Sequence, residues 1–207
     1  MRYSFVLSLL LLTAWQPNAQ TQQAYMRLGQ KALAEGDFRL AVISLEKFCN
    51  NDSSNVNALW MLGYSYYHVN NHPKAISTYT RLIALTPKDP ASAFYYRGRS
   101  RSFVAQSNTT FPQDKERYFT GAISDFTQSI SLEPGDMKSY QNRGIAYQEY
   151  GKFKMSRSNS RFYDKRKAIS SLNASISDFE TVSAQNPQRR DMTSLLERSK
   201  ELLGKVR

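Results

Sequence analysis

The sequence predicts an all-α protein in which helical hairpins stack in tandem. Three observations carry the prediction. Gly63 and Ala75 are small residues set among large ones, at a spacing that lets two antiparallel helices approach closely. Pro87 follows, and proline ends a helix because it lacks an amide hydrogen and its ring clashes with the preceding turn. The pattern recurs with a period of about 34 residues, and one hairpin cannot bury its own apolar face without neighbours.

The central stretch carries the pattern most completely. It reads Leu59-x2-Leu62-Gly63-x2-Tyr66, then Ala75-x3-Tyr79, then Pro87. This spacing resembles the tetratricopeptide repeat, a helix–turn–helix unit. The resemblance implies an α-α superhelix, a solenoid of about four such repeats with a capping helix at its C-terminal end.

The first 19 residues have the composition of a secretory signal peptide. Arg2 is basic, residues 5–14 are mostly apolar, and small or polar residues lead to Ala19, after which we expect cleavage. The alternative is an uncleaved membrane anchor. The apolar run is shorter than the ~20 residues that span a bilayer, so we expect no transmembrane span once the signal is removed.

Residues 22–207 are predicted to form the repeat domain. The copies run over about 22–55, 56–89, 91–136 and 137–189, and residues 190–206 form the capping helix. Equivalent glycines mark the four first helices: Gly29, Gly63, Gly98 and Gly144. Arg97 and Arg143 stand where the family prefers leucine. We expect their stems to lie along the surface with the charge in water.

The third and fourth copies each contain an insertion between their two helices. Gly63 and Ala75 are close in sequence. The equivalent pairs, Gly98 with Ala122 and Gly144 with Ser175, lie further apart along the chain. Equivalent points of stacked repeats lie on one edge, so the insertions should be neighbours. We expect them mainly to extend the second helices toward the N-terminus, with Phe162 in the second extension. A fourth copy without helix before Ala168 would refute this.

The second insertion is strongly basic. It forms a basic edge of seven residues: Lys152, Lys154, Arg157, Arg161, Lys165, Arg166 and Lys167. One interpretation is a solvated, flexible edge. The other is a patch for an acidic partner or for an anionic glycan or lipid surface, consistent with the formal net charge of +11. Nucleic acid is a weaker alternative because basic and aromatic residues do not alternate regularly.

The resemblance also implies a binding groove lined by the first helices. Carried onto this sequence, it places His68 and Phe103 among the groove positions, together with seven candidate partner-binding residues: Trp60, Tyr64, Tyr67, Tyr95, Arg99, Lys138 and Gln141. Exposed aromatic and arginine side chains suit binding hot spots. The alternative is that some of these rings pack between helices as core. The Lys/Asn pattern with which some family members hold a C-terminal carboxylate is absent.

Candidate residues for chemistry are few. His68 and His72 have the spacing of a helical metal pair, but Asn70 and Asn71 place a turn between them. Cys49 is the only cysteine, which excludes an intramolecular disulfide and suits a buried apolar position. We find no nucleophile elbow, phosphate loop or paired-carboxylate motif, so we expect no enzyme activity, metal or cofactor.

Two functional hypotheses remain. The first is an exported, extracytoplasmic adaptor that holds a peptide or protein segment in the groove. The second is a structural subunit of a larger envelope or secretion assembly, held through its convex face and basic edge. A more distant third is a binder of anionic glycan or lipid.

Overall fold

The structure is a computed structural model that describes residues 17–86, 91–185 and 187–206. Most of the predicted signal peptide and Pro87 lie outside these ranges. Within them the chain forms α-helices and one short 3-10 helix, with no strand. In chain order they are α1 (Pro17–Ala34), α2 (Phe38–Asn51), α3 (Val56–His68), α4 (His72–Leu85), α5 (Ala91–Gln106), α6 (Pro112–Leu132), α7 (Met137–Met155), η1 (Arg157–Phe162), α8 (Lys165–Gln185) and α9 (Arg190–Val206).

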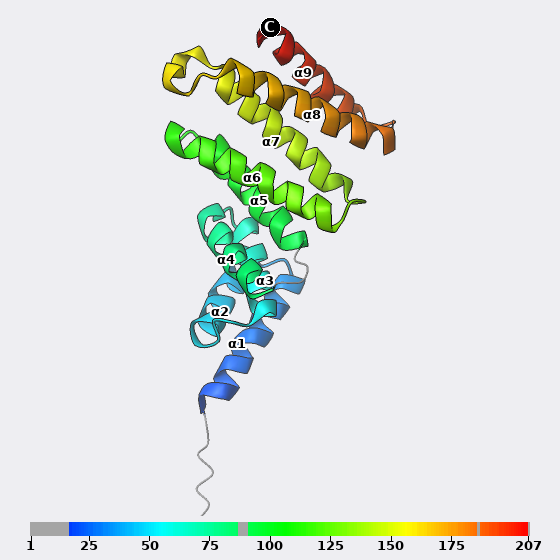
Figure 1. Cartoon of the computed structure of the whole chain (residues 1–207). Helices are drawn as coiled ribbons and strands as arrows, with labels where there is room; N and C mark the ends of the chain where they lie inside the picture. The colour runs from blue at the N-terminus through cyan, green and yellow to red at the C-terminus, as the bar shows by residue number, and fades with distance from the viewer. Residues whose placement is uncertain (1–16, 87–90, 186, 207) are drawn as a thin grey trace, which may run out of the picture.

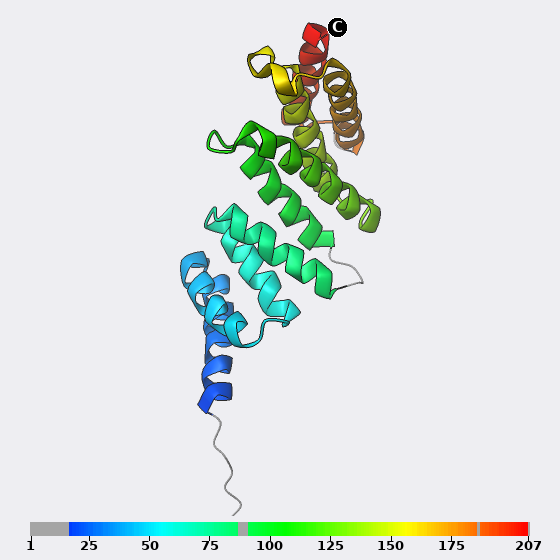
Figure 2. The ribbon, with the colours of Figure 1, turned by 60° about the vertical axis from the view of Figure 1, so that its left-hand side comes forward.

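The helices form antiparallel hairpins that follow one another along an elongated stack, with α1 at one end and α9 at the other (Figures 1 and 2). Each helix packs mainly against its neighbours in sequence. Among the described residues, the substantial contacts between next-but-one helices all join odd-numbered helices: α1 with α3, α3 with α5, α5 with α7 and α7 with α9. The first helices therefore lie on the inner side of the curved stack. The predicted all-α class is confirmed.

Side-chain caps fix where several helices begin. Asp37, Asn55 and Asn71 each accept a hydrogen bond from a backbone amide in the first turn of α2, α3 and α4. Such caps satisfy amides that the helix itself leaves without partners. The turn before α2 also contains Gly36, whose φ of +77° favours glycine. Polar turn chemistry thus separates the two helices of each early hairpin.

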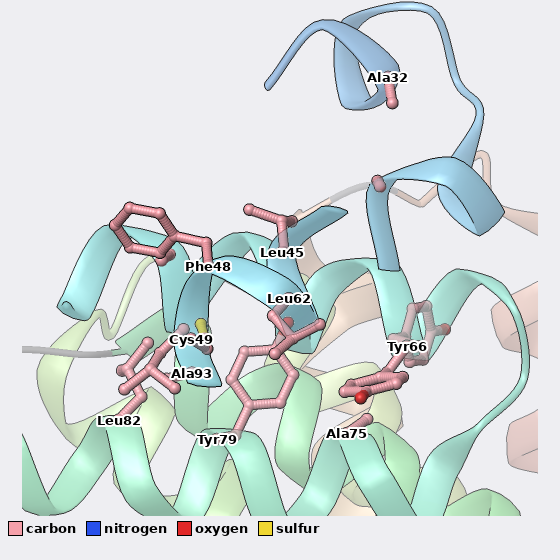
Figure 3. Packing of buried hydrophobic residues seen from close by; sticks show 14 residues of the cluster. Ala32, Leu45, Phe48, Cys49, Leu62, Tyr66, Ala75, Tyr79, Leu82 and Ala93 are labelled. Atoms are coloured by element: carbon pink, nitrogen blue, oxygen red, sulfur yellow. The ribbon is translucent and has the colours of Figure 1, made fainter. Parts of the chain in front are cut away.

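The glycines of the repeat motif let each hairpin close. A Cβ atom on Gly63 would lie 2.9 Å from the ring of Tyr79, and one on Gly144 would lie 2.7 Å from the ring of Phe179. Gly29 faces Leu45 and Gly98 faces Phe126 in the same way. The four glycines have equivalent surroundings, as the repeat spacing requires. Figure 3 shows Leu45, Leu62 and Tyr79 gathered in the interior between α2, α3 and α4.

Arg97 and Arg143 differ from their prediction. The guanidinium of Arg97 pairs with Asp125 of α6 at 2.7 Å, and that of Arg143 pairs with Asp178 of α8 at 2.7 Å. Both carboxylates are buried inside their hairpins. The arginine charges therefore lie against a buried partner rather than in water. Leu62 and Thr78 occupy the equivalent positions of the second repeat. Each of the later repeats therefore has an arginine and an aspartate where the second has a leucine and a threonine.

The insertions lengthen the helices on both sides of the turn. Helices α6 and α8 begin at Pro112 and Lys165, ten residues before Ala122 and Ser175, whereas α4 begins three residues before Ala75. The extension of the second helices is therefore confirmed, although only a short part of α8 precedes Ala168. α7 is extended as well, through Met155.

Phe162 does not belong to the α8 extension. It ends the 3-10 helix η1, and its ring packs against Phe153 of α7 at 5.8 Å between centroids. The helical spacing from Phe162 to Ile169 is therefore interrupted at residues 163–164. The amide of Asp164 donates to the carbonyl of Lys154 across this break, which ties the start of α8 to α7.

Helix α9 covers the last hairpin. Met192 and Leu203 are buried, and Met192 packs with Phe179 and Val182 of α8. Gln148 of α7 is 1 % exposed and donates to the carbonyl of Leu195 at 3.0 Å and to Ser199 Oγ at 2.6 Å. The helix thus shields both apolar and polar groups that would otherwise end the stack.

Candidate functional site

The predicted groove residues lie on the inner helices α3, α5 and α7. Trp60 and Tyr64 are one turn apart on α3, and their rings stack with centroids 5.2 Å apart. Trp60 Nε1 also donates to Ser92 Oγ of α5 at 3.2 Å. Both rings are partly exposed. Together they form a ring surface on the second repeat, and the hydrogen bond to Ser92 joins it to the third.

Tyr67 corrects the groove prediction. It is 9 % exposed and packs edge-on against Tyr96 of α5 with centroids 5.2 Å apart. The guanidinium of Arg99 lies 5.1 Å from its ring centroid. Neighbouring side chains on α4 and α5 therefore cover Tyr67, which supports the groove from beneath and offers little surface to a partner.

Tyr95 and Arg99 lie on α5 beside this ring surface. Both are partly exposed. Arg99 lies over Tyr67, and it is 5.9 Å from the ring centroid of Tyr95 and 5.8 Å from that of Phe103. Such cation–π contacts stabilise a guanidinium among rings. Tyr95 Oη accepts a hydrogen bond from Asn142 of α7 at 3.3 Å, which joins the third repeat to the fourth.

The groove prediction missed three rings of the cluster, which are Phe38, His72 and Tyr96. Phe38 stacks on His68 at 4.2 Å, His72 stacks on Phe103 at 4.5 Å, and Tyr96 packs against Tyr64. Phe38 and His72 begin the second helices α2 and α4, so the spacing of first helices could not reveal them. The aromatic cluster comprises Phe38, Trp60, Tyr64, Tyr67, His68, His72, Tyr95, Tyr96 and Phe103.

The two histidines serve packing. Burial lowers the pKa of His68 and of His72, and the nearby Arg99 lowers both further. Each is therefore favoured in the neutral form that stacks on a ring. Within the described ranges, no group of three or more His, Cys, Asp or Glu side chains is placed to hold a metal ion.

Helix α7 supplies the polar end of the groove. Lys138 is exposed. Gln141 Oε1 accepts a hydrogen bond from Arg189 at 3.0 Å, which connects α7 to the start of α9. Between α5 and α7 lies a pocket of about 210 Å³, lined by Arg99, Ser102, Phe103, Gln106, Asn142 and Ile145. The groove thus runs from rings on α3 to amides and cations on α7.

Lys154 corrects the prediction for the basic edge. It is 4 % exposed, and its ammonium pairs with Glu116 of α6 at 2.9 Å. Lys167 of α8 pairs with the same carboxylate at 3.2 Å, and Tyr150 donates to it at 2.8 Å. Burial alone would raise the pKa of Glu116, but the hydrogen bonds from Lys154, Tyr150 and Lys167 outweigh it and the pKa is lowered. The two insertions are thus neighbours, joined through one carboxylate.

The remaining basic edge is largely at the surface. Arg157 belongs to η1, and its side chain lies outside the described ones. Lys152 pairs with Glu149 at 3.5 Å. The exposed members of the edge are Lys152, Arg161, Lys165, Arg166 and Lys167. Lys152 lies near the end of α7, Arg161 in η1, and the three others in the first turn of α8.

Comparisons with known proteins agree with this geometry. Residues 57–89 match the family model of the tetratricopeptide repeat. The chain thus contains one tetratricopeptide repeat that the family model recognises, in the second of its helical hairpins. No curated protein matches it in sequence. Proteins built from these repeats are protein-interaction scaffolds, and the fold supports that general role here.

Solved tetratricopeptide-repeat proteins share the architecture over almost the whole chain. The MamA protein is 20 % identical, with 90 % of this chain and 94 % of that chain covered and a TM-score of 0.56. MamA from Desulfovibrio magneticus RS-1 is 15 % identical, with 89 % and 94 % covered and a TM-score of 0.55. A thermophilic repeat protein from Thermus thermophilus, TTC0263, is 17 % identical, with 88 % and 98 % covered and a TM-score of 0.50. At these identities the likeness concerns the fold.

In the part of the chain that the structure describes, no helix has the length and apolar content needed to cross a bilayer.

Proposed function

We propose that the protein is an exported, non-enzymatic adaptor that holds a peptide or protein segment against α3, α5 and α7. The observation that supports this most is the ring surface of Trp60, Tyr64 and Tyr95 with Arg99 beside it. Rings and a guanidinium bury much area with few rotatable bonds, which favours binding. The groove residues offer ring faces, amides and cations, which suit recognition.

Export rests on the sequence of residues 1–19, which combines a basic start, an apolar run and small residues before Ala19. Cleavage there would leave a mature chain that begins at Gln20, inside the first turn of α1. The mass of the protein purified from its own host tests this part separately. A full-length mass with Met1 retained would contradict cleavage.

Photo-crosslinking in the native host tests the groove. A photoreactive phenylalanine analogue replaces Tyr64 of the groove, and in a matched variant it replaces the exposed Gln128 on the outer helix α6. We expect a protein crosslinked at position 64, with its site of attachment mapped by mass spectrometry to one defined segment. The Trp60→Ala change in the Tyr64 variant should abolish that adduct. Adducts only at position 128 would contradict the proposal.

The second candidate is a structural subunit held through its outer face and basic edge. The exposed cluster Arg161, Lys165 and Arg166 supports it, because like charges gathered on one edge attract an acidic surface. Charge reversal of these three residues should release the protein from its assembly, whereas Trp60→Ala should not. An anionic glycan or lipid partner would show instead as strong salt sensitivity with no effect of the ring substitutions.

A further inference from the structure

Arg99 differs from the two arginines nearest to it on α5. Arg97 and Arg101 are one turn apart on the face toward α6, and both pair with Asp125 at 2.7 Å. Arg99 lies between them in sequence and therefore on the opposite face. Among the residues that the structure describes, none accepts a hydrogen bond from its guanidinium or forms an ion pair with it. Its neighbours are the rings of Tyr67, Tyr95 and Phe103.

This arrangement leaves hydrogen-bonding capacity unused in a partly buried place. A guanidinium has five N–H donors in a planar fork, and ring faces satisfy none of them as an oxygen atom would. A charge that is partly removed from water is stabilised by an opposite charge. Asp125 and Asp178 supply such a charge to the arginines that they contact, but no described carboxylate pairs with Arg99.

The adjacent pocket has the polarity to receive an acceptor. Arg99, Ser102 and Gln106 line it from α5, and Asn142 and Ile145 line it from α7. The hydroxyl of Ser102 is buried and has no hydrogen-bond partner in the structure. Few buried polar groups in native proteins lack a partner, and a bound water or ion is one reason for such a group. Side chains from two helices therefore line one small volume, where the free donors come from α5, because the amide of Asn142 already donates to Tyr95 Oη and to the carbonyl of Lys138.

The electrostatic surroundings favour an anion. Among the described residues that line the pocket, Arg99 is the one with a charged side chain. Burial and the charge of Arg99 hold the pKa of His72 below its usual value, so His72 is neutral at neutral pH and adds no second positive charge. The pocket therefore carries one positive charge, which a single carboxylate would neutralise.

We propose that Arg99 and the Ser102 pocket bind the carboxylate of an internal Asp or Glu side chain of the segment held in the groove. This rests on the proposed function and names the chemistry of its ligand. Arg–carboxylate pairs form two parallel hydrogen bonds, which suits a guanidinium that has ring neighbours and no acceptor among the described residues. The acid is internal because the pocket lies mid-groove, between the rings of α3 and the polar residues of α7. A segment can then continue in both directions.

A displayed library of random 12-residue peptides tests the proposal on the full mature chain. The wild-type protein should enrich peptides that share aromatic or apolar residues and one acidic residue at a fixed internal position. The best peptide is then synthesised with a fluorophore, together with its Glu→Gln or Asp→Asn analogue and a C-terminally amidated form. Affinities are measured by fluorescence anisotropy at two salt concentrations.

Three variants give the comparison. Arg99→Gln removes the charge and the fork, Arg99→Lys keeps the charge only, and Arg27→Gln removes an exposed arginine of α1 as a matched control. We expect Arg99→Gln to lower the affinity for the acidic peptide about tenfold or more. Its affinity for the Gln or Asn analogue should equal that of the wild type. Arg99→Lys should recover only part of the loss, and Arg27→Gln should change nothing. Unaltered circular dichroism and thermal unfolding confirm that each variant is folded.

The outcomes separate this proposal from the proposed function. Enrichment of peptides that need Trp60 and Tyr64 but show no acidic preference overturns the Arg99 proposal and leaves groove binding in place. Loss of binding on amidation, with no effect of Glu→Gln, assigns the pocket to a chain terminus and also overturns the proposal. Failure to enrich any peptide that depends on Trp60 and Tyr64 contradicts both.

Discussion

At the scale of single residues, replacing a glycine has opposite effects at a helix contact and on an open helix face. Gly144→Ala would place a Cβ atom 2.7 Å from the buried ring of Phe179, so we expect a loss of about 1–3 kcal/mol in the free energy of unfolding. Gly204 lies inside α9 with nothing within 4 Å of its Cβ position. Gly204→Ala should stabilise the protein by about 0.5–1 kcal/mol, because alanine favours a helix. Urea denaturation measures both changes. Equal stabilities of the Gly144→Ala and Gly204→Ala variants would contradict the close approach of Gly144 to Phe179.

The buried pair of Arg143 and Asp178 gives a second prediction at this scale. Arg143→Leu leaves a carboxylate buried without its cation, and we expect a loss of about 3 kcal/mol. The double change Arg143→Leu with Asp178→Thr restores the pair that the second repeat has in Leu62 and Thr78. It should recover most of that loss.

A double-mutant cycle in urea denaturation measures the coupling between the two positions. Strictly additive effects of the two single changes would show that the guanidinium and the carboxylate do not support each other.

How much the sequence could predict differs between these residues. The glycine spacing specified the helix contacts because a close approach excludes a side chain wherever it occurs. The Arg97 and Arg143 pairs were missed although Asp125 and Asp178 stand in matching segments, since each partner looks ordinary alone. Only the fold shows that both positions face one another across a hairpin. The prediction that Tyr67 is exposed was wrong for a similar reason, because the side chains that bury it belong to α4 and α5.

At the scale of elements, the extended ends of α6, α7 and α8 depend on the carboxylate of Glu116. It holds the buried ammonium of Lys154 and also contacts Tyr150 and Lys167. Glu116→Ala should cost about 3 kcal/mol, because it leaves Lys154 buried and unpaired. Hydrogen exchange should rise first in residues 112–118 and 150–167. The double change Glu116→Gln with Lys154→Met should recover most of the protection, and exchange spread evenly along the chain would contradict this account.

The same carboxylate predicts the acid sensitivity of this edge. The pKa of Glu116 is lowered in the folded state, because its hydrogen bonds outweigh the effect of burial. The stabilisation is therefore present above the unfolded pKa of about 4.5 and is lost as the pH falls through the folded value. Glu116→Gln should remove part of the pH dependence of unfolding below about pH 5. An unchanged profile would show that other carboxylates dominate.

Helix α9 closes the stack and gives a prediction for a whole element. A chain that ends at Gln188 would expose Phe179 and Val182 and leave Gln148 without its partners Leu195 and Ser199. We expect a melting temperature lower by several degrees and increased binding of an apolar dye. Removal of an equal length from α1 at the other end is the comparison. A truncated chain as stable as the whole would show that α9 does not cap the repeats.

At the scale of the molecule, the sequence was most informative where a pattern repeats. Tandem copies predicted the all-α stack, the position of α9 and the shared edge of the insertions. The groove was predicted only in part, because a rule for first helices cannot find rings at the start of second helices. Phe38 and His72 enter the cluster from there, and both contact rings of the next helix pair. Contacts between repeats therefore decide details that the period alone leaves open.

Those inter-repeat rings make the stability of the whole array depend on pH. His72 begins α4 and stacks on Phe103 of α5, and Arg99 and Tyr67 are its other close neighbours. Because burial and Arg99 lower its pKa, the unfolded chain binds a proton before the folded one does. Stability should therefore be constant above about pH 6.5, where His72 is neutral in both states, and fall as the pH drops below that value toward the folded pKa. Urea midpoints between about pH 7.5 and 5.5 measure the slope. The variant with His68→Gln and His72→Gln should be less stable at about pH 7.5 but nearly flat over this range, and a slope equal to that of the wild type would assign the proton to another group.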